Sequence, residues 1–322
     1  MSKISVGIDI SKVKFDAAIF FENNKFKTKK FENKLSGFLE LMAWLKKHDA
    51  LDAHTCLEAT GIYGDALATY LFEANYQVSV VNPAQIKGFA QSELSRNKTD
   101  KADALLIARF CRAINPSLWQ PKSPHVRELG NWAHRLEGLQ DLYRQEANRL
   151  EAVVSVDVRA SIETILKHLK KEIQAVKKKI NTHIDKHPDL RDKKQLLETI
   201  PGVGEATITQ VLAFMGNIED FKNAKQLAAF VGLNPKQRQS GSSVNGRTRL
   251  SKIGDARLRK AFYMPAISAK KYNPVVKAFC KRLEAAGKPT MLIIGAAMRK
   301  LVHLIYGVLK SGKAFDAALA TG

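Results

Sequence analysis

Short apolar runs separated by polar turns characterise the first hundred positions and predict strands. The runs occupy residues 4–8, 13–21, 25–31, 53–57 and 76–81. In the first run apolar residues alternate with small ones, which predicts a strand with one buried face and places Asp9 on the other face. The turn-forming residues 22–24 predict that the first strand continues into an antiparallel meander.

Segments with helical spacing of apolar residues separate the later apolar runs. Apolar residues recur at steps of three and four in two segments, Phe38, Leu41, Met42 and Leu45, and then Leu67, Tyr70 and Leu71. Three early strands followed by alternating helices and strands predict a mixed sheet with helices on its faces.

A long helical connector follows. From about Arg127 to His187 the chain has almost no helix breaker, and Pro188 ends the segment. Its apolar residues follow alternating steps of four and three, at Ile162, Leu166, Leu169, Ile173, Val176 and Ile180. This spacing predicts a heptad seam, with pairing either inside the chain or to a second subunit. The lysines on the outer faces are equally well explained as the solvated side of a helix hairpin.

Four carboxylates occupy positions at which a metal-dependent nuclease needs them. Asp9 and Glu58 end strands, whereas Asp100 and Asp103 lie three residues apart and share one face of a helix's first turn. Carboxylate oxygens suit Mg²⁺, and one or two ions, about 4 Å apart when paired, would polarise a phosphate and activate the attacking oxygen. Each acid alone is also explained as a turn or helix cap. All four in this order favour the metal site.

The charge balance points to the same substrate. Lysine and arginine number 52 against 31 acidic residues, which gives a net charge of +21 and a pI near 9.8. Such a balance is typical of nucleic-acid binding. A membrane surface would also attract it, but no apolar run reaches the roughly 20 residues that span a bilayer, and no signal peptide is expected. The cysteines are three and far apart, which argues against a disulfide framework or zinc site and favours the cytoplasm.

Two segments of the last third carry candidate nucleic-acid contacts. Residues 196–207 resemble a helix-hairpin-helix, in which Gly202 and Gly204 would bring backbone N–H groups to a phosphate. An ordinary Pro-Gly turn between two helices explains this motif equally well. Residues 236–252 are rich in Ser and Gly, which predicts a flexible loop, and basic residues crowd this loop and the segment that follows it.

The same loop contains candidate nucleophiles, Ser240, Ser242 and Ser243, and Ser251 follows closely. A nucleophilic serine needs a base or metal to help remove its proton. No histidine lies nearby in sequence, so a carboxylate-bound metal is the natural activator. This would require the two ends of the chain to meet.

Together these motifs resemble the DEDD transposases of bridge-RNA-guided insertion sequences, to which the pilin-gene invertases are related. The resemblance runs nearly end to end in one order and rests on residues 7–12, 57–61, 97–104, 200–204, 240–243 and 258–264. It implies an α/β N-terminal RuvC-like (RNase H fold) domain with a coiled-coil insertion and a mainly α C-terminal transposase domain. The expected bounds are 1–126, 127–194 and 195–322.

The resemblance also implies residue roles. Asp9, Glu58, Asp100 and Asp103 would bind Mg²⁺, and Ser240, the first serine of Ser-Gly-Ser-Ser, would be the nucleophile. The residues expected to contact nucleic acid are Arg96, Lys98, Gly202, Gly204, Arg247, Arg249, Lys252, Arg257 and Arg259.

By this resemblance the enzyme is a recombinase. Ser240 would form a phosphoserine link to DNA, strands would exchange through a junction, and a structured guide (bridge) RNA would pair with target and donor DNA. Family members work as tetramers whose active sites combine domains of different subunits, so a dimer to tetramer is expected. A RuvC-like junction resolvase or nuclease that uses water is the competing expectation, but it would not require the second half of the chain. A DNA-binding structural protein leaves the four acids unexplained.

Overall fold

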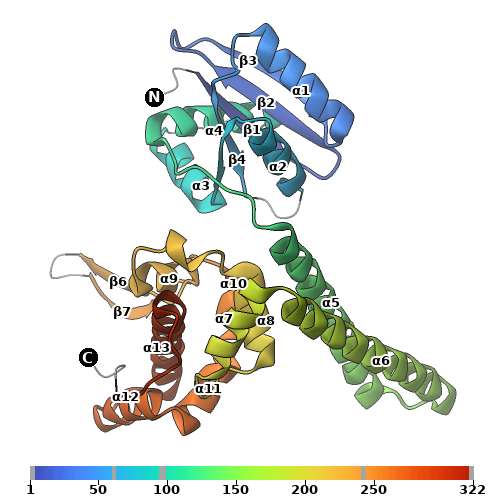
Figure 1. Cartoon of the computed structure of the whole chain (residues 1–322), viewed down its shortest axis with the longest axis vertical. Coiled ribbons are helices and arrows are strands. Elements are labelled where there is room, and N and C mark those ends of the chain that lie inside the picture. Colours follow the sequence, from blue (N-terminus) through green and yellow to red (C-terminus); the bar gives the residue numbers. More distant parts are fainter. Residues whose placement is uncertain (1–3, 60–62, 94–98, 241–243, 319–322) are drawn as a thin grey trace. The chain divides into compact units, whose positions relative to one another are not determined.

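The chain forms two compact units, Met1–Pro121 and Lys122–Gly322 (Figure 1). The structure, a computed structural model, describes residues 4–59, 63–93, 99–240 and 244–318, with the backbone alone at 238–240, 244, 245 and 247. Each unit has its own hydrophobic core.

A five-stranded mixed sheet forms the centre of the first unit. Its strands are β1 (Ser5–Ile10), β2 (Lys14–Phe20), β3 (Phe26–Glu32), β4 (His54–Glu58) and β5 (Gln77–Val81), in the spatial order β3-β2-β1-β4-β5. The pairs β1–β2 and β2–β3 are antiparallel, whereas β1–β4 and β4–β5 are parallel. The predicted meander and mixed sheet are therefore confirmed.

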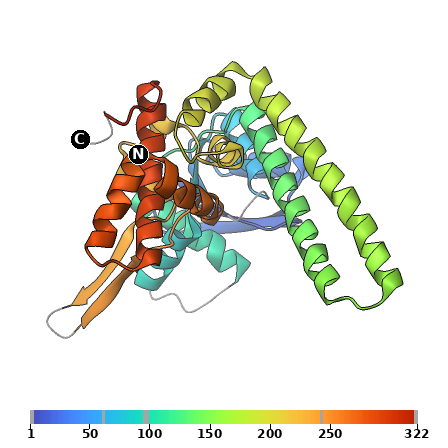
Figure 2. The same cartoon turned by 90° about the horizontal axis from the view of Figure 1, so that it is seen from below.

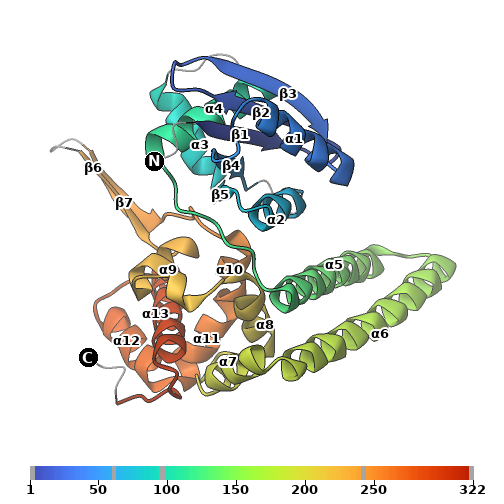
Figure 3. The same ribbon diagram turned by 45° about the horizontal axis from the view of Figure 1, so that its top comes forward.

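Helices cover both faces of this sheet (Figure 3). On one face α1 (Leu35–Lys47) and α2 (Asp65–Glu73) pack Phe38, Leu41 and Leu67 against Ile8 and Phe15. The other face carries α3 (Pro83–Ser92) and α4 (Asp100–Ile114). The strands are rich in aromatic and β-branched residues, and the segments between them have apolar residues at helical spacing. Each helix buries its apolar face on the sheet, which gives three layers.

Close packing at Gly7 fixes where α4 lies. A Cβ at Gly7 would stand 2.2 Å from the Ala104 carbonyl oxygen and 2.2 Å from the Ala108 nitrogen, so only glycine lets the helix backbone rest on β1. One turn later along α4, the Ser5 hydroxyl donates to the Ala108 carbonyl at 2.8 Å. Hence α4 runs antiparallel to β1, and its first turn lies toward the end of β1 that carries Asp9.

The second unit begins with a helix pair, α5 (Pro124–Ala152) and α6 (Val156–Lys186), which lie side by side (Figure 2). The predicted seam is buried at Ile162, Leu169, Val176 and Ile180. Of the two pairings that the sequence allowed, the structure shows α6 packed on α5 of the same chain. A break at residues 153–155 separates the two helices, within a segment in which the sequence showed almost no helix breaker.

Helices build the remainder of this unit. They are α7 (Pro188–Glu198), α8 (Glu205–Phe214), the 3₁₀ turn Ile218–Asp220, α9 (Ala224–Phe230), α10 (Ala256–Ala261), α11 (Tyr263–Tyr272), α12 (Pro274–Ala285) and α13 (Thr290–Ser311). Within the described residues, α13 alone is long and apolar enough to cross a membrane, which corrects the expectation that no segment reaches that length. However, Leu301, Val302 and Ile305 of α13 lie in the core of the unit, as in the central helix of a globular domain.

A two-stranded antiparallel ribbon interrupts the helices. It consists of β6 (Pro235–Ser240) and β7 (Val244–Leu250), with a bulge between Lys236 and Arg238. The prediction of a flexible loop over residues 236–252 was wrong for residues 236–240 and 244–250, which are strands, whereas residues 241–243 lie outside the described residues. Val244, Thr248 and Leu250 alternate at strand spacing, and paired backbone groups satisfy one another across the ribbon.

Candidate active site and nucleic-acid interface

Two of the four predicted acids lie near the carboxyl ends of neighbouring parallel strands, Asp9 as the penultimate residue of β1 and Glu58 as the last residue of β4. The register pairs Gly7 with Cys56 and Ile8 with Leu57, so the next residues, Asp9 and Glu58, are neighbours across β1 and β4. Side chains two residues apart on a strand share a face. Asp9 therefore points to the face that Gly7 presents to α4, and both acids are half-buried there.

The other two acids lie in the first turn of α4. Thr99 caps this helix, because its hydroxyl accepts a hydrogen bond from the Ala102 nitrogen at 3.2 Å. The exposed N–H groups of a helix start favour carboxylates such as Asp100 and Asp103. Because α4 runs antiparallel to β1 from this point, the fold brings the helix acids to the same end of the sheet as the strand acids.

Asp16 is a fifth carboxylate on this face, and the sequence reasoning missed it. The antiparallel register pairs Asp9 with Asp16, and Asp16 in turn with Lys30 on β3. Asp16 is 3% exposed, and its carboxylate lies 3.7 Å from the Lys30 ammonium. The tight connection between β1 and β2 sets this register, and it is the signal from which the pair Asp9–Asp16 could have been found.

Asp100 contacts two lysines of the β-meander. Its Oδ2 accepts a hydrogen bond from the Lys14 ammonium at 3.3 Å and lies 3.9 Å from the Lys30 ammonium. Both lysines stand on the α4 face of the meander. The sequence reasoning gave neither lysine a role.

The donor set fits a hard divalent cation, because Asp9, Glu58 and Asp103 supply oxygen ligands at one end of one sheet face. In the described part of the chain, however, no group of three or more His, Cys, Asp or Glu residues is close enough to hold a metal ion. The structure thus brings the acids to a common edge without assembling a closed cluster.

The turn between α7 and α8 assigns different environments to its two glycines. Gly202 has φ +98°, and a Cβ there would come within 2.8 Å of the Ala269 backbone, so it serves the packing of the turn on α11. The Asn273 amide donates to the Pro201 carbonyl at 3.2 Å and ties the same turn down. Gly204 is exposed in front of α8, with open space around it. Of the two glycines, Gly204 is the more exposed and is therefore the better candidate for the phosphate contact.

The predicted cations of the last third also divide into two groups. Arg249 and Lys252 are exposed. Arg257 donates to His134 at 2.8 Å and to Asp255 at 3.2 Å, and it lies over the Phe214 ring. Arg259 donates to the Val231 carbonyl at 3.3 Å and the Lys252 carbonyl at 3.1 Å. Arg257 and Arg259 therefore hold the unit together, a role that sequence reasoning did not assign to them.

Several predicted residues fall outside this description. Ser240 is the last residue of β6 and its backbone pairs with Val244, but its side chain lies outside the described part of the structure, as does that of Arg247. Arg96 and Lys98 lie outside the described residues altogether.

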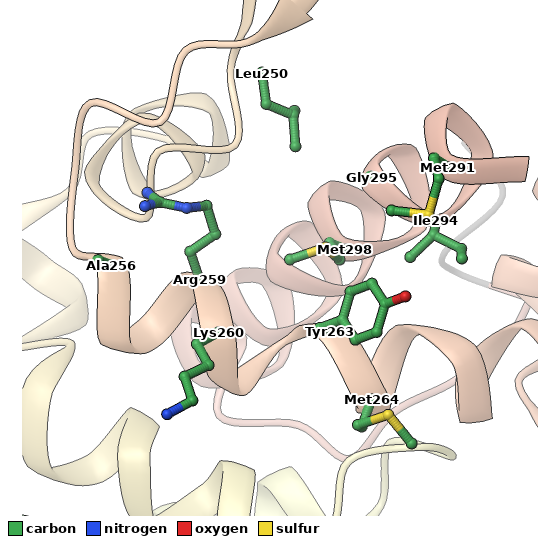
Figure 4. Close-up of a pocket in the computed structure, with 10 residues that line it drawn as sticks. All are labelled: Leu250, Ala256, Arg259, Lys260, Tyr263, Met264, Met291, Ile294, Gly295 and Met298. Atoms are coloured by element: carbon green, nitrogen blue, oxygen red, sulfur yellow. The ribbon is translucent and has the colours of Figure 1, made fainter. Parts of the chain in front are cut away.

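A pocket of about 650 Å³ adjoins the base of the ribbon (Figure 4). Leu250 from β7, Tyr263 and Met264 from α11, and Ile294 and Met298 from α13 line it. Its lining is thus mainly apolar. Lys260 also lines the pocket, and its ammonium group lies 3.4 Å from the Glu137 carboxylate.

Comparison with known proteins places these features in a family. Residues 6–156 match the model of the IS110-type DEDD transposases, described as "Transposase", and residues 194–281 match that of the "Transposase IS116/IS110/IS902 family". The chain is 37% identical to the pilin gene-inverting proteins of Moraxella bovis and Moraxella lacunata over 98% of each chain. It is 24% identical to an uncharacterized 43.6 kDa protein of insertion element IS110 from Streptomyces coelicolor, over 50% of this chain and 39% of that protein.

Proposed function

Since the chain belongs to the IS110 family of DEDD transposases and is a DNA-recombining enzyme, we propose that it is an RNA-guided recombinase with a serine nucleophile. The observation that most supports metal-dependent phosphodiester chemistry, the first part of this proposal, is the placement of α4. Its antiparallel course over β1 brings the first-turn acids to the strand ends that carry Asp9 and Glu58.

We propose that Asp9, Glu58 and Asp103 hold Mg²⁺, with Asp100 as the fourth ligand. Bound Mg²⁺ would supply charge stabilisation for the phosphate and lower the pKa of a coordinated hydroxyl. The Ser240 Oγ forms a bond to the DNA phosphorus, and the bond from phosphorus to one of its DNA oxygens breaks, which leaves a DNA hydroxyl end. Attack by a hydroxyl end of the other DNA restores a phosphodiester and releases serine. The bond energy of the phosphodiester is thus conserved in the protein–DNA link.

The remaining parts of the chain have roles consistent with this reaction. We propose that residues 1–126 form a RuvC-like domain, residues 127–194 a coiled-coil connector, and residues 195–322 the transposase domain. A structured guide RNA selects target and donor DNA, and the excess of positive charge supports binding of both nucleic acids. The enzyme acts in the cytoplasm as a dimer to tetramer, in which Ser240 of one subunit reaches the acids of another.

Transposition and DNA inversion share this cleavage and rejoining chemistry. The full-length similarity to the two pilin gene-inverting proteins supports site-specific recombination rather than simple hydrolysis. A RuvC-like resolvase or nuclease would instead use water, and Ser240 would then have no chemical role.

A suicide DNA substrate separates these two possibilities. A nick near the cleavage point lets the released strand diffuse away, so that a serine–DNA link cannot reverse. We expect wild-type protein to give a labelled adduct on a denaturing gel, with the modified peptide containing Ser240. The variant Ser240→Ala should lose the adduct and still bind DNA and RNA, whereas Ser242→Ala and Ser243→Ala should retain it at least in part. Cleaved DNA without an adduct, at an unchanged rate in Ser240→Ala, would support the hydrolytic enzyme.

A further inference from the structure

Two lysines occupy the approach to the acid edge of the first unit. Lys14 on β2 and Lys30 on β3 converge on one oxygen of Asp100, at 3.3 and 3.9 Å. Lys30 also lies 3.7 Å from Asp16, which is buried on the same face. The cluster contains two cations and two carboxylates, and it adjoins Asp9 through the register pair Asp9–Asp16.

The members of this cluster differ in how firmly they are held. Asp16 is 3% exposed in the middle of the sheet, so it forms a fixed anchor for Lys30. The side chains of Lys14, Lys30 and Asp100 are 46, 47 and 57% exposed. Ion pairs at such exposed positions contribute little to stability, so their partners can be exchanged readily. A phosphate, which offers several anionic oxygens to the same ammonium groups, can therefore replace Asp100 as their partner.

We propose that Lys14 and Lys30 form a phosphate-binding pair for a DNA strand at the acid edge, and that they hold Asp100 away from the metal until that strand arrives. This inference rests on the proposed metal site. DNA binding at the pair releases the Asp100 carboxylate to the other acids, so the metal site is completed where a phosphodiester is present. Without DNA, the lysines compete with the metal ion for Asp100.

Lys29 provides a matched control on the same strand. It has the same charge as Lys30, a similar exposure of 45%, and one exposed carboxylate partner, Glu40, at 3.8 Å. It pairs in register with Ala17, so it stands on the opposite face, over the Phe31 ring.

The first experiment measures Mn²⁺ binding to the DNA-free protein from the electron paramagnetic resonance signal of the free ion. We expect Lys14→Gln/Lys30→Gln to bind Mn²⁺ about three- to tenfold more tightly than wild type, because the competitors for Asp100 are gone. Lys29→Gln should change the affinity less than about twofold. The gain should disappear when Asp100→Asn is added to the double variant. A gain that persists with Asp100→Asn would reflect general electrostatics and overturn the release of Asp100, as would an unchanged affinity in the double variant.

The second experiment measures DNA binding without metal as a function of salt. The logarithm of the DNA association constant falls linearly with the logarithm of the salt concentration. Loss of two phosphate contacts should make this slope shallower by about 2 in Lys14→Gln/Lys30→Gln. The slope should stay that of wild type in Lys29→Gln. Equal slopes in all three proteins would overturn the phosphate-binding pair. Thermal melting and circular dichroism of each variant establish that the first unit is folded.

These outcomes are separable from failure of the proposed function. If Asp9→Ala binds Mn²⁺ as wild type does, the proposed metal site is wrong, whatever the lysine variants show. If Asp9→Ala loses Mn²⁺ binding while Lys14→Gln/Lys30→Gln behaves like wild type, the metal site stands and the lysine pair is refuted.

Discussion

Two arginines near the ribbon have different roles, and their contacts show which one stabilises the fold and which one is free to contact nucleic acid. Arg259 donates to two backbone carbonyls and so joins the residues before and after the ribbon. Arg249 is exposed on the ribbon itself. The two arginines have the same charge and lie ten residues apart, yet only the environment of Arg249 suits a direct contact with phosphate.

We expect Arg259→Ala to destabilise the second unit by about 1–3 kcal/mol, because two carbonyls lose a charged donor. Arg249→Ala should leave the melting temperature nearly unchanged and lower DNA affinity to a similar degree across sequences. Differential scanning calorimetry and binding titrations at two salt concentrations measure both effects. The assignment fails if Arg259→Ala melts like wild type and loses as much DNA affinity as Arg249→Ala.

The strand acids give a second prediction at this scale. Asp9→Ala, Glu58→Ala and Asp103→Ala should each abolish Mg²⁺-dependent cleavage, because each removes a ligand and its negative charge. Glu73→Ala, an exposed acid on α2 at the other face of the sheet, is the control and should cleave normally. Adduct formation on the nicked substrate, measured with and without Mg²⁺, reports the effect. Full activity of Asp9→Ala would remove the basis for the site.

At the scale of elements, the residue pattern predicts what is local. Alternating apolar residues and the turn at 22–24 predict the meander, and steps of four and three predict the buried seam of α6. Asp16 and the lysine contacts were missed because they depend on cross-strand register and on the course of α4, which pair residues far apart in sequence. The ribbon was missed because its Gly and Ser content outweighed the alternation of Val244, Thr248 and Leu250.

The turn between α7 and α8 allows its two glycines to be compared. Gly202→Ser places a Cβ against Ala269 at positive φ, which should cost about 1–3 kcal/mol of unfolding free energy. Gly204→Ser places a favoured N-cap residue in open space, so stability should be kept or slightly raised. Urea denaturation of the two variants measures the difference. Equal stability would show that the turn is not packed on α11 as described.

At the scale of the whole molecule, the proposed catalytic groups are divided between the two compact units. The four acids lie in Met1–Pro121, whereas Ser240 and the ribbon lie in Lys122–Gly322. A reaction that needs both must bring them together either within a chain or between chains. The motifs for the acids and for the serine can both be read from the sequence. The assembly that joins them depends on contacts between folded surfaces, which local sequence patterns do not predict.

Mixing two inactive variants distinguishes these assemblies. Asp9→Ala lacks an acid but keeps Ser240, and Ser240→Ala lacks the nucleophile but keeps the acids. If an active site combines the first unit of one subunit with the second unit of another, co-expressed variants should form some sites that are intact in both halves. We therefore expect each variant alone to give no adduct on the nicked substrate, and the mixture to give a clear fraction of the wild-type adduct. Peptide mapping should find this adduct on the Asp9→Ala chain, which carries Ser240. A mixture as inactive as its components, despite co-purification of the two chains, would place both halves of the site in one chain.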